Sequence, residues 1–263
     1  MLLAAAAATM YAATMVGLHR LGVARRRARA GGFHALRRLD WDSLLEGLLP
    51  SGDFTRRDVP GRLPTGDVTP ALLRHTPPSG AEAPHQLLLE LVLGAPLRDL
   101  DARARGAGLA GGALEWVRTL TLAHADPDTA LERLDRARPT AAPEVYLREY
   151  LGLVHRTNAL NLELSVFRAK RRLAGALVRF GDRPCLYFTR ALASSCVGMN
   201  AAAIDDLARA VYFSHQAPFY LRAVVDTPFI EEVRPVLMHQ CREALARAEQ
   251  EPPRAMAEPL RLG

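Results

Sequence analysis

Histidine and cysteine are the residue types in this chain that most often carry catalysis or bind metals. The three cysteines, Cys185, Cys196 and Cys241, have no CxxC spacing, and their odd number argues against a disulfide framework. The eight histidines are scattered singly, without the i,i+4 spacing with which two histidines of one helix bind zinc. We therefore predict neither a metal site nor a cofactor, and this cysteine usage suits a reducing compartment.

Catalytic sequence signatures do not accompany these residues. The chain contains no P-loop, HExxH, GxSxG or CxxC element, which argues against the P-loop nucleotide-binding, metalloprotease and hydrolase classes. A dyad of Glu149 with His155, or of Cys196 with a distant histidine, is conceivable from residue type alone. Single histidines are usually structural or exposed, so we expect a protein that is not an enzyme and has no small-molecule substrate.

One basic run, FRAKRR at 167–172, offers a second kind of chemistry. Its cationic residues Arg168, Lys170, Arg171 and Arg172 spread around a predicted helix, where they can meet phosphate, anionic lipid or an acidic peptide. A charged run is more often a solvated helix face. No aromatic residues are interleaved with these cations, as stacking on single-stranded nucleic acid would require. We treat the four as candidate partner-binding residues.

The net charge of +6 is concentrated near the N-terminus. Seven arginines precede the first acidic residue, Asp40, so the remaining 27 of the 34 basic residues face 28 acidic ones. The body of the chain is therefore close to neutral. A basic stretch beside an apolar segment is typical of a chain that contacts a lipid surface. We therefore expect no nucleic-acid partner.

That apolar segment opens the chain and carries no charge from Met1 to Leu18. Its length is at the lower limit for a helix that crosses the hydrocarbon core. The arginine cluster at 25–29 then acts as a cytoplasmic stop signal. The sequence predicts a single-pass transmembrane anchor over 1–24, with the body on the cytoplasmic side. A transit peptide with a mitochondrial inner-membrane location, a cleaved secretory signal and a plain buried helix are the alternatives.

Composition divides the rest of the chain into three parts. Residues 25–84 are expected to form a basic juxtamembrane stretch and a linker, because 51–84 contains six prolines and four glycines with little periodicity. Residues 85–250 show helical periodicity without a convincing period-2 strand. Residues 251–263 are expected to be a flexible tail. The predicted fold class is therefore all-α.

Proline and glycine residues mark the ends of the expected helices. Asp126 is the clearest N-cap, with Pro127 at the first helical position, and Gly181 is expected to end a long helix. Asp205 and Arg209 are expected to form an exposed i,i+4 pair. The last helix is predicted to run without a break from the Thr227–Pro228 start, with an apolar stripe of Phe229, Val233, Leu237, Cys241 and Leu245.

The helices on either side of Gly198 resemble a tetratricopeptide repeat. The family's positions are occupied, in its order and spacing, by Tyr187, Ala191, Gly198, Ala203, Leu207 and Ala210. The segment 126–139 is similar to the second helix of such a repeat, with its alanine Ala130 73 residues before Ala203. The resemblance covers roughly 111–247 and implies a TPR-like α-solenoid of antiparallel helix pairs. An irregular helical bundle is the alternative.

The resemblance also implies a function. Stacked helix pairs present a concave groove to proteins, so we expect a membrane-anchored adaptor or scaffold whose partners are other proteins. Exposed residues of each pair's first helix would line that groove, and the candidates are Arg118, Arg148 and Arg190. The alternative is an accessory structural subunit of a larger membrane or mitochondrial inner-membrane complex, in which apolar residues would cover more than one face.

Overall fold

The structure is a computed structural model, and it describes residues 33–45, 48, 87, 88, 90–92, 94, 98–155 and 162–250. Every regular element in these residues is a helix, which confirms the predicted all-α class for this part of the chain. Among the described residues, no helix has the length and apolarity needed to cross a membrane. The predicted anchor at 1–24 and the predicted tail at 251–263 lie outside them.

The described chain begins with two short elements, the 3-10 helix η1 (His34–Arg37) and α2 (Trp41–Leu45). Further helices follow after the predicted linker. They are α5 (Leu100–Gly106), α6 (Gly112–Ala125), α7 (Pro127–Arg136), α8 (Ala142–Val154), α9 (Leu162–Phe180), α10 (Pro184–Cys196), α11 (Asn200–Phe213), α12 (Pro218–Val225), α13 (Phe229–Val233) and α14 (Pro235–Gln250).

The ends of these helices follow from proline, glycine and capping chemistry. The Asp126 carboxylate accepts a hydrogen bond from the Thr129 amide at 3.2 Å and Pro127 opens α7, so the predicted cap is confirmed. Gly181 follows the last residue of α9 with a φ of +79°, in the left-handed region that glycine adopts at little cost. Its predicted role as a helix stop is confirmed.

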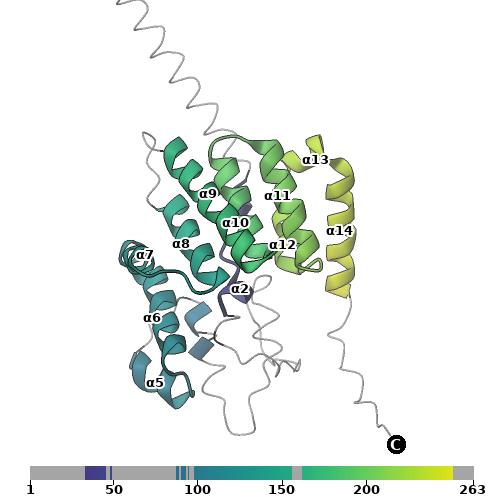
Figure 1. Ribbon diagram of the computed structural model, residues 1–263. Coiled ribbons are helices and arrows are strands. Elements are labelled where there is room, and N and C mark those ends of the chain that lie inside the picture. The colour runs from purple at the N-terminus through teal and green to yellow at the C-terminus, as the bar shows by residue number, and fades with distance from the viewer. Residues whose placement is uncertain are drawn as a thin grey trace, which may run out of the picture.

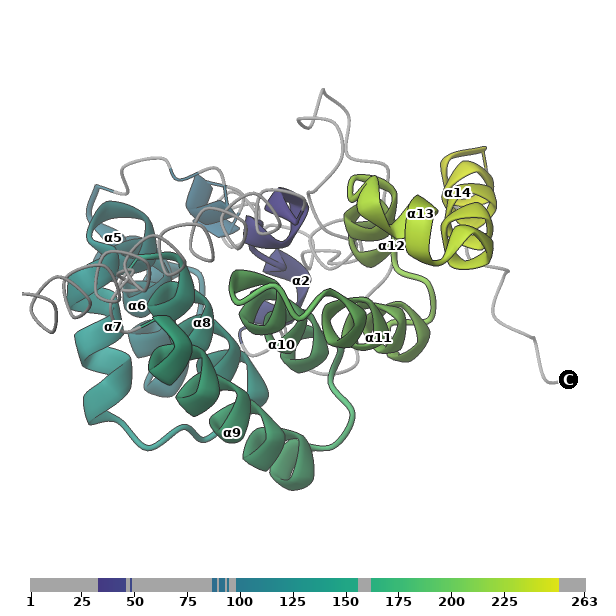
Figure 2. The same cartoon turned by 90° about the horizontal axis from the view of Figure 1, so that it is seen from above.

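The helices pack in a repeating pattern. Consecutive helices form the neighbouring pairs α6–α7, α8–α9 and α10–α11, and the second helix of each pair also packs against the first helix of the next. The first helices α8 and α10 contact each other directly, and α12 packs against α14. Figure 1 shows α8 to α11 side by side, and Figure 2 shows that the whole array curves.

Helix α10 lies at the centre of this array. Ten of its 13 residues are buried, and it packs against η1, α8, α9 and α11. Small residues make close packing possible on several sides, since Ala191 and Ala193 of α10 and Ala203 and Ala210 of α11 are all inaccessible to solvent. Ala191, Ala203 and Ala210, which carried the sequence resemblance around Gly198, are thus core residues.

The C-terminal end differs from the predicted single helix. Pro235 divides it into α13 and α14, because proline lacks the amide hydrogen and clashes with the preceding turn. The expected apolar stripe is therefore broken: Cys241 is buried, but Val233 is 47% exposed. Arg234, which lies in the break, pairs with Asp205 at 2.6 Å, so the predicted pairing of Asp205 with Arg209 is wrong.

The N-terminal segment 33–48, of which the structure describes residues 33–45 and 48, also differs from its prediction. It falls within the expected juxtamembrane and linker region 25–84, yet its apolar side chains belong to the core. Those exposed by at most 5% are Phe33, Ala35, Leu36, Leu44, Leu45 and Leu48. Figure 2 shows α2 inside the curve of the helical array. The structure corrects the predicted domain boundary here, because this segment packs with the helical body.

Candidate interaction sites

The first candidate site is the inner face of the curved array, which contains the segment 33–48. Within that segment η1 contacts α10 and α12, and α2 contacts α8. These three partners are the first helices of consecutive pairs. The segment therefore crosses the array from pair to pair.

Hydrogen bonds from the array reach the backbone of this segment. The Trp116 indole N–H of α6 donates to the Leu44 carbonyl oxygen at 2.7 Å. The Tyr150 hydroxyl of α8 donates to the Arg37 carbonyl oxygen at 2.5 Å. Because these bonds engage carbonyl groups, they position the chain itself, while specificity comes from the side chains that enter the core.

Asp40 is the polar centre of the segment and is only 2% exposed. Its carboxylate accepts hydrogen bonds from the Tyr220 hydroxyl of α12 and from the Ser43 hydroxyl, the latter at 2.5 Å. Its own backbone amide donates to the Tyr146 hydroxyl of α8 at 2.7 Å. Asp40 therefore connects two helices of the array, α8 and α12, through tyrosine hydroxyls.

Aromatic contacts complete the inner face. Trp41 of α2 stacks on the imidazole of His124 with ring centroids 5.0 Å apart and planes inclined by 10°. Phe33 meets Phe229 of α13 at 6.2 Å. Burial lowers the pKa of His124, which favours the neutral ring that stacks here. This histidine is thus a packing residue of the inner face.

Burial also controls the ionisation of the tyrosines around the segment. It raises the pKa of Tyr150 to about 12 and raises the pKa values of Tyr146 and Tyr220 well above their ordinary range. The negative charge of Asp40 acts in the same direction on Tyr146 and Tyr220. The three hydroxyls are therefore neutral hydrogen-bonding groups at physiological pH.

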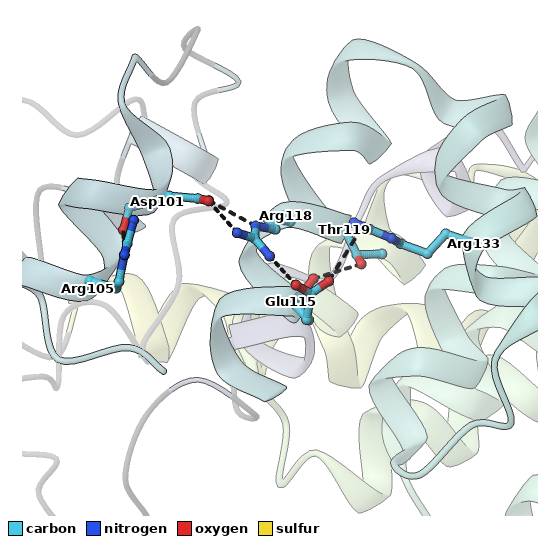
Figure 3. A network of polar contacts seen from close by, with 6 residues as sticks. All are labelled: Asp101, Arg105, Glu115, Arg118, Thr119 and Arg133. Atoms are coloured by element: carbon cyan, nitrogen blue, oxygen red, sulfur yellow. Dashed lines mark hydrogen bonds and ion pairs between the residues drawn. The ribbon is translucent and has the colours of Figure 1, made fainter. Parts of the chain in front are cut away.

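Arg118, a predicted partner-binding residue, lies in a network between α5, α6 and α7 (Figure 3). Its guanidinium donates to the Asp101 carboxylate of α5, with Nε 2.9 Å from Oδ1, and also pairs with Glu115. Glu115 lies 3.4 Å from Arg133 of α7. The hydrogen bond from Arg118 lowers the pKa of Asp101. Arg118 thus joins neighbouring helices.

Arg148 and Arg172 share one buried acceptor, Glu149, which is 1% exposed. Arg172 of α9 makes a two-pronged contact with this carboxylate of α8, at 2.6 and 2.7 Å, and Arg148 donates to it at 3.0 Å. The carboxylate is therefore engaged by two guanidinium groups. This geometry gives no support to a catalytic dyad of Glu149 with His155.

Arg190 makes the corresponding contact between α10 and α11. Its guanidinium donates twice to the Asp206 carboxylate, at 2.8 and 2.6 Å, and lies over the Tyr187 ring at 5.1 Å from the centroid. Both charged side chains are mostly buried, at 18% and 8% exposed. Together with Arg118 and Arg172, Arg190 joins helices of the array to one another.

The other predicted partner-binding residues lie on the outer side of α9. Arg168 and Arg171 are exposed, and Lys170 is half-buried with its amine 3.8 Å from the Met199 sulfur. Phe167, the first residue of the basic run, is 65% exposed. The structure therefore separates the seven candidates into three groups. Arg118, Arg172 and Arg190 join helices, Arg148 pairs with its neighbour Glu149 within α8, and the other three lie on the outer side of α9.

A glycine pattern between α5 and α6 was missed in the sequence. Gly106, Gly108 and Gly111 have the GxGxxG spacing of a dinucleotide-binding loop and precede the N-terminus of α6. In that fold the loop must follow a β-strand. Here it follows the helix α5, and Glu115 places a negative charge in the first turn of α6. The context is therefore that of a helix–helix turn.

The cysteines lie in packed surroundings. Cys185 and Cys196 occupy opposite ends of α10, and Cys241 is buried in α14. Burial raises the pKa of Cys196 and raises that of Cys241 to about 11, which keeps both thiols protonated at neutral pH. Among the described residues there is no group of three side chains with the composition of a metal site.

No protein-family model, no curated protein and no solved structure matches this chain. Function must therefore be inferred from the contacts of the molecule itself. Two surfaces offer the material for that inference. One is the inner face with its docked segment 33–48, and the other is the outer face of α9 with its exposed apolar and cationic side chains.

Proposed function

We propose that this protein is a non-catalytic adaptor, in which stacked tetratricopeptide-like helix pairs hold the N-terminal segment of the same chain and present their outer face to a protein partner. The observation that carries the proposal is the segment 33–48 on the inner face. It is bound through carbonyl contacts from Trp116 and Tyr150 and through buried apolar side chains. A groove with these contacts is built to hold a peptide chain.

The packing pattern supports the repeat-like part of this proposal. In helical repeats each unit contacts only its neighbours, and the second helix of one unit packs against the first helix of the next. The contacts α7–α8, α9–α10 and α11–α12 follow this order, and the inner face consists of the first helices. Small buried residues at α10–α11 give the close crossing that such pairs need.

The position of the docked segment indicates how far the helical body would lie from the proposed membrane anchor. Phe33 enters the core only four residues after Arg29, the last residue of the basic cluster. An anchor over 1–24 would therefore hold the helical body close to the lipid surface. The Pro- and Gly-rich stretch 51–84 would then connect two parts of the body, since it follows the docked segment in the chain.

A second candidate function is supported by a different observation. Large apolar side chains are exposed on more than one face, as Tyr212 of α11 at 74% and Val236 of α14 at 67%, in addition to those of α9. A permanent subunit of a larger membrane or mitochondrial inner-membrane complex would cover several such faces. An adaptor that binds one partner would use one of them.

Site-specific photo-crosslinking in cells tests both candidates. A photoreactive amino acid would replace Val178 of α9, Tyr212 or Val236, one at a time, in the full-length protein. An adaptor should give a discrete crosslinked product from one face, and a permanent subunit should give products from several. Absence of a product at all three positions would contradict both functions.

Membrane fractionation tests the anchor separately. Full-length protein should resist carbonate and need detergent for extraction, whereas a chain that begins at Gly32 should be released without detergent. If both are released by carbonate, or if the mature protein begins near Ala30, the proposed anchor is wrong. The crosslinking result does not depend on this outcome, because the photoreactive positions lie in the helical body.

A further inference from the structure

The inference concerns the exposed side of α9 and rests on the proposed adaptor function, whose partner it describes. We propose that this side binds an amphipathic, acidic helix of a partner protein. The surface, called here the α9 ridge, consists of Leu164, Phe167, Arg171, Ala174 and Val178. The steps between these residues are three, four, three and four, the spacing with which one helix packs along another.

The α9 ridge points away from the rest of the protein. The buried residues of α9 are Val166, Ala169, Leu173 and Ala176, which pack toward α8 and α10. At 100° per residue, these four lie on the side of the helix opposite the ridge. Each ridge residue is classed as exposed. The ridge is therefore a continuous helix face without a partner among the described residues.

Large apolar side chains mark both ends of the ridge. Leu164 is 49% exposed, Phe167 is 65% exposed and Val178 is 90% exposed. Single exposed apolar residues need no explanation, but three on one face of one helix form a patch. Met199, 49% exposed, lies near α9, with its sulfur 3.8 Å from the amine of Lys170, a residue outside the ridge.

Small residues occupy the centre of the ridge. Ala174 is exposed, and beside it Gly175 has nothing within 4 Å of the position where a Cβ would lie. Small residues allow two helix backbones to approach closely, at roughly 8 Å between axes. A straight helix can therefore lie between the Leu164–Phe167 end and Val178, over a length of roughly 21 Å.

Charge defines the partner further. Arg171 lies in the middle of the ridge, and Arg168, Arg172 and Arg179 follow one flank at helical spacing. A helix that covers Arg171 must offer a carboxylate to it, since an unpaired buried guanidinium is costly. Arg168 extends the positive charge along that flank, whereas the guanidinium of Arg172 is already paired with Glu149. The partner helix is therefore apolar on one face, acidic at its centre and acidic along one flank.

The same residues argue against a lipid surface as the occupant. A helix that lies in a membrane interface places its bulky apolar side chains at the deepest position and its cations at the edges. On α9 the deepest position is occupied by Arg171, Ala174 and Gly175. The small residues add little to insertion into lipid, and the central arginine opposes it, whereas both suit a helix with a carboxylate.

A synthetic peptide is the appropriate probe. It would be a helical peptide of about 18 residues with leucine on one face, one central glutamate on that face and further glutamates along one flank. A matched peptide carries lysine at each glutamate position. Binding of the labelled acidic peptide to detergent-solubilised full-length protein would be followed by fluorescence anisotropy. A single helix of this length buries a small interface, so the expected affinity is micromolar.

Two variants test the contacts. Arg171→Glu should weaken binding of the acidic peptide about tenfold and strengthen binding of the lysine peptide, because the charge at the centre is reversed. Val178→Asp should also weaken binding of the acidic peptide about tenfold, because an apolar contact is lost. The control is Val236→Asp on α14, an exposed valine outside the ridge, which should leave binding unchanged.

Each of the other outcomes overturns the inference. No binding of the acidic peptide, or equal binding by Arg171→Glu and the parent protein, shows that the ridge is not this docking site. The same variants would be tested on vesicles of phosphatidylcholine and phosphatidylserine. A loss of vesicle binding in Arg171→Glu, with peptide binding unchanged, would assign the ridge to a lipid surface.

Failure of the inference differs from failure of the proposed function. If cellular crosslinks form from Tyr212 or Val236 but not from Val178, the adaptor function stands and the partner uses another face. If the acidic peptide binds the ridge and no crosslink forms at any position in cells, the ridge has the proposed chemistry and the adaptor function is wrong.

Discussion

At the scale of single residues, Asp40 links the N-terminal segment to the array more closely than any sequence motif indicated. A buried carboxylate is stable only when its oxygens accept hydrogen bonds. Tyr220 and Ser43 supply them. Because Tyr146 accepts from the Asp40 amide, the residue is held by both its backbone and its side chain. Asp40 therefore fixes the register of the segment on the inner face.

Substitution of Asp40 should be among the most damaging changes in the segment. Asp40→Ala leaves the buried Tyr220 hydroxyl without its acceptor, and we expect the free energy of unfolding to fall by about 2–4 kcal/mol. Urea unfolding followed by circular dichroism measures this change. Arg38→Ala is the control, since Arg38 pairs with Asp226 at an exposed position and should matter much less. Equal effects of the two substitutions would contradict this role for Asp40.

The buried tyrosines predict a loss of stability in alkali. Tyr150 has a folded-state pKa of about 12, above the roughly 10 of an unfolded tyrosine. Between these values the unfolded chain has released the phenolic proton and the native protein has not, so stability falls as pH rises. Tyr146 and Tyr220 act in the same direction.

The experiment compares Tyr150→Phe with the parent protein in urea unfolding from pH 8 to pH 11.5. The variant loses the hydrogen bond to the Arg37 carbonyl and should be less stable at pH 8 by about 1 kcal/mol. Its stability should then fall less steeply above pH 10. Parallel pH profiles of the two proteins would show that Tyr150 ionises equally in both states.

At the scale of elements, arginine–carboxylate contacts recur between neighbouring helices. Arg190 with Asp206 joins α10 to α11, and Arg172 with Glu149 joins α8 to α9. A two-pronged guanidinium contact fixes orientation as well as distance. The stacked helices are therefore joined by ion pairs in addition to their apolar core. For this reason many of the candidate binding arginines are engaged within the protein.

We expect burial to determine how much each of these ion pairs contributes to the free energy of unfolding. Arg190→Ala leaves the Asp206 carboxylate, 8% exposed, without its guanidinium, and should lower the free energy of unfolding by about 2–4 kcal/mol. Arg242→Ala breaks an equally well-formed contact with Glu231 of α13, but both side chains are about half exposed. Its effect in the same urea experiment should be much smaller. A larger loss for Arg242→Ala would show that burial is not the deciding factor.

Much at this scale could be predicted from the sequence. Asp126, Pro127 and Gly181 carry local signals for helix ends, and those ends were predicted correctly. The break at Pro235 had an equally local signal, which the apolar stripe on either side concealed. Arginine partners could not be predicted, because Arg190 and Asp206 are 16 residues apart and meet only when α10 and α11 fold against each other.

At the scale of the whole molecule, the segment 33–48 could not be assigned to the body from its sequence. Its elements, η1 and α2, have four and five residues, which is too short for helical periodicity to appear. The buried set Phe33, Leu36 and Leu44 is separated from the other helices by a Pro- and Gly-rich stretch. The position of the segment on the helical array depends on contacts with the tyrosines and the tryptophan of three helices that are distant in the sequence.

This placement predicts where the chain can be shortened. Large apolar side chains of the segment, among them Phe33, Leu36, Leu44 and Leu45, are nearly inaccessible to solvent, and burial of each contributes about 1.5–3 kcal/mol. Their combined contribution is comparable with the whole stability of a typical domain. A chain that begins at Ser51 should therefore expose the inner face and lose cooperative unfolding, whereas one that begins at Gly32 should unfold cooperatively.

Circular dichroism during urea unfolding, with size-exclusion chromatography, compares these two chains. A synthetic peptide of residues 32–50 added to the shorter chain provides a further test, because a preformed groove would recover cooperative unfolding in proportion to peptide concentration. Recovery would show that the array binds a peptide on its inner face. If the shorter chain is monomeric and as stable as the longer one, the segment does not contribute to the core. The proposal that the inner face holds this segment as a bound peptide would then be wrong.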